Sequence, residues 1–168
     1  MSPPPRDRGE ADEARRIAAL ESELREIYRE VDAAHEGWSC DASTDCCHFA
    51  RTGREPYVTT IEARLVARAR AALGGKPTKE RRLPMARDER RCPLLDDGGR
   101  CSVYASRPFG CRTFYCERAT PGERVRQREI NAFVARIRGI AARYTPGRDT
   151  GAPLTRALDA LGRGTSTR

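Results

Sequence analysis

A chain of 168 residues is long enough for one domain with a modest core and too short for two large ones. Hydrophobic residues make up 38 % and charged residues 33 % of it, so apolar side chains are scarcer than in an ordinary globular domain, and a metal cross-link is the obvious candidate for extra stability. The net charge of +8 comes from 30 arginines and 2 lysines interleaved with 24 acidic residues, a mixed pattern that argues against nucleic-acid binding as the main function.

Nothing in the sequence indicates a membrane protein. No apolar segment follows Met1 as in a signal peptide, and no run approaches the roughly 18 apolar residues of a membrane span. We therefore expect a cytoplasmic location. In a reducing cytosol, clustered cysteines are expected to be metal ligands or redox groups rather than disulfides.

The sequence predicts one domain flanked by flexible termini. Residues 1–10 carry three prolines and little to bury, which predicts a disordered leader. Apolar residues then recur every three or four positions from Asp12 to about His35, which predicts a helix lying on the core. We expect the single domain to span residues 11–145, with a flexible tail over 146–168 that contains at most a short turn.

Two more helices have clear start signals. Thr59 and Glu62 form the pattern of a capping box, so a helix is predicted from there to Leu73. Thr120, Pro121 and Glu123 repeat that pattern and predict a helix to Tyr144. The residues expected on its buried face are Ile130, Phe133, Ile137, Ile140 and Tyr144. Between these helices, residues 76–91 are predicted to be an exposed connector.

A hairpin is predicted around Asp96–Gly99, which separates two short apolar segments. A turn centred on Asp97 and Gly98 would place Leu94 opposite Cys101, with Cys92 diagonally across on the same face. Seven of the ten aromatic residues lie between Trp38 and Tyr115, so we expect the core to be packed around the cysteines.

The seven cysteines fall into two groups on either side of the second predicted helix. Thiolates select zinc, iron–sulfur clusters or copper(I), and the spacings match neither a zinc ribbon nor a ferredoxin. His48 is a further candidate donor, less strongly indicated. The predicted metal ligands are Cys40, Cys46, Cys47, Cys92, Cys101, Cys111 and Cys116.

The segment from Cys92 to Phe114 resembles the YkgJ-type cysteine-cluster proteins, a family with a C-x-x-C-x-x-C-C motif and a zinc- or iron-chelating domain. It contains Cys-Pro-Leu-Leu, then Cys-Ser-Val-Tyr, then Arg-Pro-Phe-Gly-Cys-Arg-Thr-Phe in the family's order. The first motif departs from the pattern, because Ser43 stands where the family has its second cysteine and serine is a poor ligand for zinc or iron. Cys116 is a candidate substitute.

The resemblance implies metal or iron–sulfur binding and directs attention to Arg107 and Arg112, which sit inside the motif. We expect these arginines to neutralise a thiolate centre or to bind an anionic group, whereas Arg118 reads as a surface residue. Related cysteine clusters occur in a flagellin lysine methylating enzyme, but the chain shows no nucleotide-binding glycine loop and no Ser/His/Asp arrangement. Catalytic residues are therefore unassigned, and enzyme activity stays open.

The sequence thus predicts a mainly α fold, a small helical domain with a short cysteine-bearing β-hairpin and loops assembled around a metal site. The expected cofactor is an iron–sulfur cluster or zinc, with iron favoured. Three roles remain open: redox or cluster-handling function, a structural zinc module that binds a protein partner, and a redox or protein-modifying enzyme.

Overall fold

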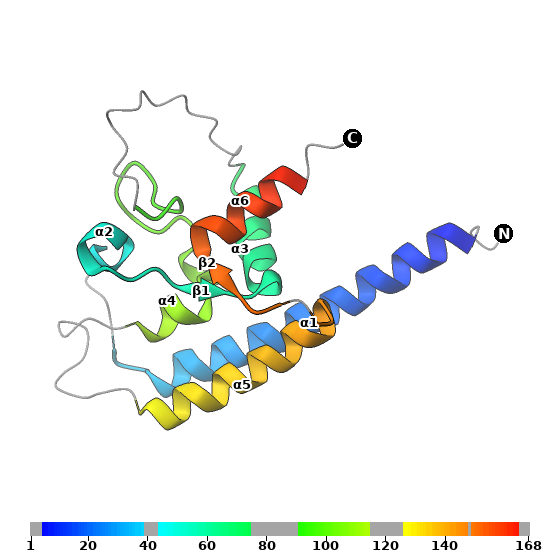
Figure 1. Ribbon diagram of the computed structural model, residues 1–168, viewed down its shortest axis with the longest axis horizontal. Coiled ribbons are helices and arrows are strands. Elements are labelled where there is room, and N and C mark those ends of the chain that lie inside the picture. The colour runs from blue at the N-terminus through cyan, green and yellow to red at the C-terminus, as the bar shows by residue number, and fades with distance from the viewer. Residues whose placement is uncertain (1–4, 39–43, 75–90, 115–125, 148, 165–168) are drawn as a thin grey trace.

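The computed structural model describes residues 5–38, 44–74, 91–114, 126–147 and 149–164, and over these residues the predicted mainly α fold is confirmed. The two longest helices, α1 (Pro5–Ala34) and α5 (Gln127–Tyr144), lie side by side and run in opposite directions (Figure 1). Ion pairs join them along their length, with Arg143 bound to Glu23 at 2.5 Å and Arg136 to Glu30. No helix among the described residues is long and apolar enough to cross a membrane.

Helix α3 (Thr60–Ala72) lies between two hydrophobic clusters and contributes a face to each. Ile61 and Leu65 face the first cluster, which is built mainly from α1, α5 and Phe109. Ala63 and Val66 face the second, which contains Cys92 and the segments around it. The expectation that the core is packed around the cysteines therefore describes only the second cluster. The predicted capping box is present, with Thr59 as N-cap.

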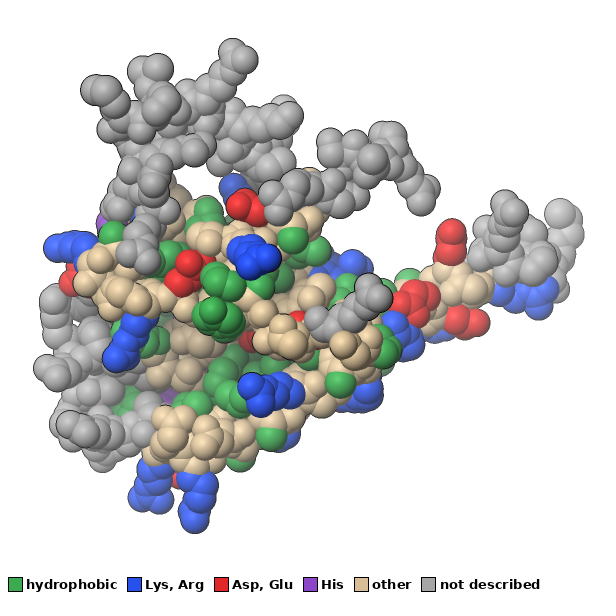
Figure 2. Space-filling view, in the orientation of Figure 1, with side chains coloured by type: hydrophobic (Ala, Val, Ile, Leu, Met, Phe, Trp, Pro, Cys, Tyr) green, Lys and Arg blue, Asp and Glu red, His purple; other side chains and the backbone are tan. Residues whose placement is uncertain are grey.

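Aromatic residues contribute less to the neighbourhood of the cysteines than the sequence predicts. Phe49 and Phe109 are buried, but Tyr57 is 68 % exposed and Tyr104 is 54 % exposed. Clustering in the sequence did not translate into burial, because Tyr57 lies on the exposed side of a two-residue strand and Tyr104 lies in a single 3-10 turn at the surface. Figure 2 shows charged side chains dispersed over one face of the molecule, as the mixed charge pattern indicates.

The first helix begins earlier than predicted. Helix α1 includes Pro5 and the residues that follow, which corrects the expected disordered leader for positions 5–10. Proline is tolerated in a first helical turn, because an N–H group there has no partner within the helix. Asp12 pairs with Arg15, and Glu13 with Arg16 at 2.7 Å, one turn apart. These local interactions support the N-terminal part of the helix, where residues 8–19 bury no side chain fully.

Helix α5 begins later than predicted. Arg126 has an extended backbone and is the N-cap of a helix that starts at Gln127. The predicted start signal, Thr120 to Glu123, lies outside the described residues, as does most of the predicted connector 76–91. The predicted apolar face is confirmed, since Ile137 and Ile140 are buried and Phe133 packs against them.

The C-terminal segment is folded rather than a flexible tail. Strand β2 (Ala152–Pro153) pairs antiparallel with β1 (Tyr57–Val58), and helix α6 (Leu154–Gly164) packs on α3. Leu154 is fully buried in the second cluster. Glu55 accepts hydrogen bonds from the backbone N–H and hydroxyl of Thr155, at 2.7 and 2.6 Å, and so caps α6. The sequence lacks a start signal here because the capping carboxylate comes from a distant residue.

Candidate metal centre

Five of the predicted ligands lie in described residues, on three separate segments of the chain. We call them the thiol cluster: Cys46, Cys47, Cys92, Cys101 and Cys111, all of which are free cysteines. The other two predicted ligands, Cys40 and Cys116, and the variant position Ser43 lie outside the described residues.

The first segment is a single turn of 3-10 helix, η1 (Asp45–Cys47), followed by the short helix α2 (Phe49–Thr52). Thr44 precedes η1 with a left-handed backbone, φ 54°, which is unusual for a β-branched residue. The Cys47 carbonyl accepts a hydrogen bond of 2.8 Å from the Cys92 N–H, and His48 forms a β-bridge with Arg91. This backbone pairing places the first and second cysteine segments side by side.

The second segment reverses direction as predicted but in a different register. Leu95, not Leu94, pairs with Cys101. The Asp96 N–H donates to the Arg100 carbonyl at 2.8 Å, which closes a three-residue loop in which Gly99 is left-handed, φ 74°. A loop of two residues would give the predicted register, and the extra left-handed residue shifts the pairing by one position.

That shift corrects the expected diagonal contact of Cys92 with Cys101 across a regular hairpin. Cys92 is held next to Cys47 instead, by backbone pairing to the first segment. Cys92 is 7 % exposed and belongs to the second hydrophobic cluster, against which Cys47 and Cys101 are packed. The thiol cluster therefore has an apolar base formed by that cluster.

The third segment is α4 (Phe109–Thr113), which carries Cys111. The Phe109 N–H donates to the buried Glu62 carboxylate at 3.0 Å, which fixes the start of α4 against the start of α3. A Cβ on Gly110 would lie 3.0 Å from the Pro56 Cβ, so only glycine at this position lets α4 pack closely against the segment around Pro56.

The thiols interact with one another in this arrangement. The Sγ atoms of Cys46 and Cys47 are 3.9 Å apart. The pKa of Cys46 is raised, first by its hydrogen bond with Cys47 and then by burial. The hydrogen bond with Cys46 lowers the pKa of Cys47, but a hydrogen bond with Cys92, burial and neighbouring charges outweigh it and raise this pKa to about 12.

The pKa values of Cys101 and Cys111 shift in the same direction. Burial raises the pKa of Cys101 and raises that of Cys111 to about 12, and the charges of other thiols in the cluster add to both effects. The four thiols with raised pKa values are therefore protonated at neutral pH without a cation. A soft metal ion would reverse this, because coordination requires thiolates and releases their protons.

The donor chemistry of the cluster suits zinc or iron, which both accept several thiolates. Among the described residues, no group of three or more Cys, His, Asp or Glu side chains has an arrangement that could hold a metal ion. A complete coordination shell thus requires movement of these side chains or further donors. His48 is half-buried next to Cys47, and its role as a ligand stays a prediction.

The two arginines of the motif differ in their surroundings. Arg112 is 3 % exposed and donates to the carbonyls of Arg107 and Ala105, at 2.9 and 2.5 Å. It also pairs with Asp32 on α1 and lies over the Tyr28 ring, 4.4 Å from its centroid. Arg107 instead lies near the thiols, where its charge lowers the pKa of Cys101 and Cys111 against the larger effect of burial. Arg118 lies outside the described residues.

Sequence reasoning missed Asp32 and the extended role of Glu62. Asp32 is one of many acids on an amphipathic helix, and no local signal distinguishes it. Glu62 was expected only as the third residue of a capping box, whereas its carboxylate also accepts hydrogen bonds from the Tyr28 hydroxyl at 2.9 Å and from Phe109.

A comparison with protein families matches residues 39–133, more than half of the chain, to the model of the CxxCxxCC family, described as "Putative zinc- or iron-chelating domain". The chain belongs to the CxxCxxCC family. All seven cysteines lie within the matched residues, so the resemblance of the sequence to this family is confirmed, and metal chelation is the property its description names. No curated protein and no solved structure shows significant similarity to the chain. In this CxxCxxCC member, Asp32 and α6 lie outside the matched residues.

Proposed function

We propose that this protein holds an iron–sulfur cluster or a zinc ion through thiolates of the thiol cluster, completed by Cys40 and Cys116. The observation that carries the proposal is the convergence of five cysteines from three segments that are far apart in the sequence, with their thiols close enough to shift one another's pKa. Bound zinc would supply a cross-link, and a bound iron–sulfur cluster would also supply an electron-transfer centre.

A structural contribution from the metal is supported by the sparse backbone pairing between these segments within the described part of the chain. Backbone pairing between the first two segments rests on the Cys47–Cys92 hydrogen bond and one β-bridge, and the loop that carries Cys101 is closed by a second isolated bridge. Metal binding to thiols from three segments would contribute directly to the free energy of folding. We therefore expect chelation to lower stability as well as to remove the metal.

The contacts of Arg107 and Arg112 support different roles for the two arginines. Arg112 directs its guanidinium to two carbonyls and Asp32, so we propose a structural role for it beside the centre. Arg107 carries its positive charge close to two of the thiols and is the better candidate for neutralising a negatively charged thiolate centre.

The first experiment is metal and sulfide analysis of protein purified without oxygen, together with its visible absorption spectrum. Iron and sulfide in stoichiometric amounts with a broad visible absorption would assign an iron–sulfur cluster and a redox or cluster-handling role. Zinc alone would assign a zinc module and direct the search to protein partners.

Variants then test the ligands. Cys46→Ser and Cys101→Ser are preferred because both side chains are partly exposed, so that the loss of a core side chain does not confuse the result. We expect each to lose most of the bound metal. Val103→Ala is the matched control, since it removes buried volume beside Cys101 without removing a donor, and it should lower stability but retain the metal. Full metal content in both cysteine variants, or no metal in the wild-type protein after reconstitution, would contradict the proposal.

A further inference from the structure

The Nε atom of Arg107 is a hydrogen-bond donor that the described residues leave without an acceptor. The Arg107 side chain is 15 % exposed, and its guanidinium lies over the Tyr104 ring, 4.0 Å from the centroid. The Nε atom is buried and has no hydrogen-bond acceptor among the described residues. A buried donor on a charged group is costly to leave unpaired, so an acceptor other than those residues is expected at this position.

The place of Arg107 in the fold indicates what that acceptor is. Arg107 follows the 3-10 turn Tyr104–Ser106, which connects the loop carrying Cys101 to α4, which carries Cys111, so it lies between two thiol-bearing segments. Thiolates and the sulfides of a metal cluster accept hydrogen bonds from N–H groups, and such bonds from outside the coordination shell orient ligands and adjust metal affinity.

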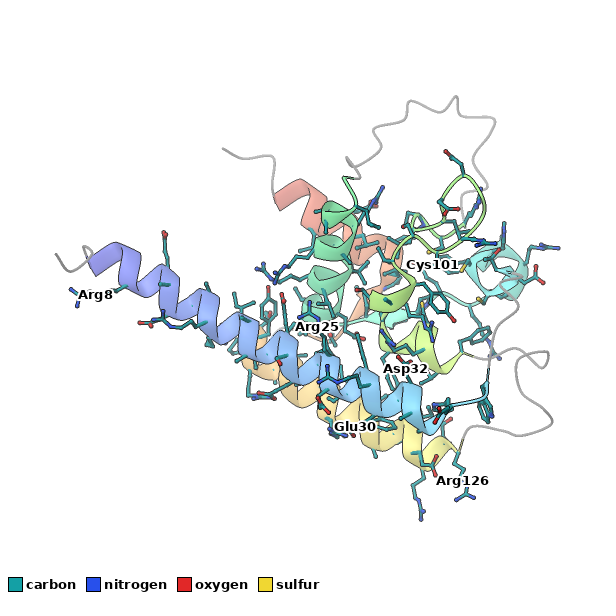
Figure 3. All side chains as sticks on the ribbon, turned by 180° about the vertical axis from the view of Figure 1, so that it is seen from behind. Arg8, Arg25, Glu30, Asp32, Cys101 and Arg126 are labelled. Atoms are coloured by element: carbon teal, nitrogen blue, oxygen red, sulfur yellow. The ribbon has the colours of Figure 1, made fainter. Side chains whose placement is uncertain are left out.

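The backbone that carries Arg107 is fixed from α1. Residues Tyr104–Ser106 form a 3-10 turn, η3, and Arg112 holds the carbonyls of Ala105 and Arg107 on either side of its end. Asp32 in the last turn of α1 pairs with Arg112 and also lies 3.7 Å from an Nη atom of Arg107. Figure 3 shows the labelled Asp32 on α1 beside α4, with the labelled Cys101 on the loop above them.

We propose that Arg107 donates its Nε–H to the thiolate metal centre and that Asp32 and Arg112 are positioning residues that hold Arg107 in place. This inference rests on the proposed function and extends it, because it makes the last turn of α1, outside the matched family domain, part of the support of the centre. Arg107 thereby supplies one positive charge and one directed hydrogen bond, whereas Asp32 acts only through the two arginines.

The test measures the affinity of the full chain for Zn²⁺ and Co²⁺ by competition with a chelator, for the wild type and for Arg107→Gln, Arg107→Lys and Asp32→Asn. We expect Arg107→Gln to weaken binding about 10-fold or more, within the range of lost outer-shell partners. Arg107→Lys keeps the charge but lacks the Nε donor, so an intermediate loss is expected. If Arg107→Gln does not fold, the lysine variant carries the comparison.

The sign of the Asp32→Asn effect separates positioning from simple charge. At neutral pH the metal ion replaces thiol protons, and Zn²⁺ or Co²⁺ bound by about four thiolates forms a centre with a net charge of about −2. Removing the nearby negative charge of Asp32 would by itself favour such a centre, whereas loss of positioning disfavours it, and we expect several-fold weaker binding. Glu30→Gln is the matched control, because Glu30 is also near the end of α1 and pairs with an arginine, Arg136, at 2.7 Å, but on the side of α5. Its metal affinity should equal that of the wild type.

A second readout distinguishes a donor to the centre from a purely structural residue. The thiolate-to-Co²⁺ charge-transfer band should shift in Arg107→Gln and Arg107→Lys and stay unchanged in Glu30→Gln, since only the first two remove a hydrogen bond to sulfur. Unchanged affinity and band position in both Arg107 variants, with the wild type binding metal, would overturn this inference and leave the proposed function intact. A wild type that binds neither ion would overturn this inference, and the proposed function would fall with it if reconstitution with iron and sulfide also gave no cluster.

Discussion

Glu62 connects three helices and provides a sharp test of the packing that positions Cys111. Its carboxylate is 3 % exposed and accepts four hydrogen bonds of 2.9 to 3.0 Å. One oxygen serves the Tyr28 hydroxyl and the Phe109 N–H, and the other serves the N–H and hydroxyl of Thr59. The substitution Glu62→Gln keeps the shape of the side chain but replaces one acceptor oxygen by an NH₂ group.

In either orientation, the amide can accept a hydrogen bond from only one of the two backbone N–H groups, that of Thr59 or that of Phe109. A hydroxyl can rotate to accept from the NH₂ group, but a backbone N–H cannot, so either Thr59 or Phe109 is left with a buried, unpaired N–H. An unsatisfied buried donor costs about 1–3 kcal/mol, and the remaining bonds lose the contribution of the carboxylate charge. We therefore expect a loss of about 2–3 kcal/mol of unfolding free energy, or a Tm lower by about 4–12 °C in a chain of this length.

The assay is urea and thermal unfolding of the metal-free protein under reducing conditions, followed by circular dichroism. Tyr28→Phe serves as the comparison, because it removes one donor and leaves the other three, and should cost only about 1 kcal/mol. Glu13→Gln, which removes an exposed partner of Arg16, should leave the urea midpoint unchanged, because exposed ion pairs contribute little to stability. A loss below 1 kcal/mol for Glu62→Gln would refute the reasoning that Glu62 joins the starts of α3 and α4.

Three further predictions concern other parts of the fold. The pKa values of Cys47, Cys111 and Tyr28 are raised in the folded protein, so folding favours the protonated forms of these side chains. Their contribution to stability is complete below the unfolded cysteine pKa of about 9 and is lost as the pH rises toward 12. The urea midpoint of the reduced, metal-free protein should therefore decrease steadily over this pH range. Gly99→Ala should cost about 1 kcal/mol in the same assay, because no atom obstructs a Cβ there and only the left-handed φ opposes it; an unchanged midpoint would contradict the three-residue loop. Leu154→Ala should cost about 2–5 kcal/mol, since Leu154 is fully buried, and a cost near zero would restore the flexible-tail expectation.

Local signals in the sequence were sufficient for several elements. The capping box at Thr59 and Glu62 identified the start of α3, because both hydrogen bonds form within one helical turn. The apolar spacing identified the buried faces of α1 and α5, because a helix fixes which side chains share a face. The cysteine motif identified the family, and with it zinc or iron chelation.

Predictions that depended on a backbone detail or on a distant residue were the ones that needed correction. The hairpin register changed because Gly99 adds a left-handed residue that the composition of the turn does not specify. Helix α6 was missed because its cap, Glu55, lies about a hundred residues away in the sequence. The aromatic residues near the cysteines in the sequence do not all pack around them, because the exposure of Tyr57 and Tyr104 depends on how their segments lie on the core.

The sequence by itself determined the class of fold, the helical faces and the family, since each of these depends on patterns of residues close together in the chain. Only the tertiary structure decided which thiols meet, because Cys92 is paired to Cys47 by a backbone bond between distant segments. It also decided the surroundings of Arg107 and Arg112, since Asp32 reaches both arginines only through the packing of α1 against α4.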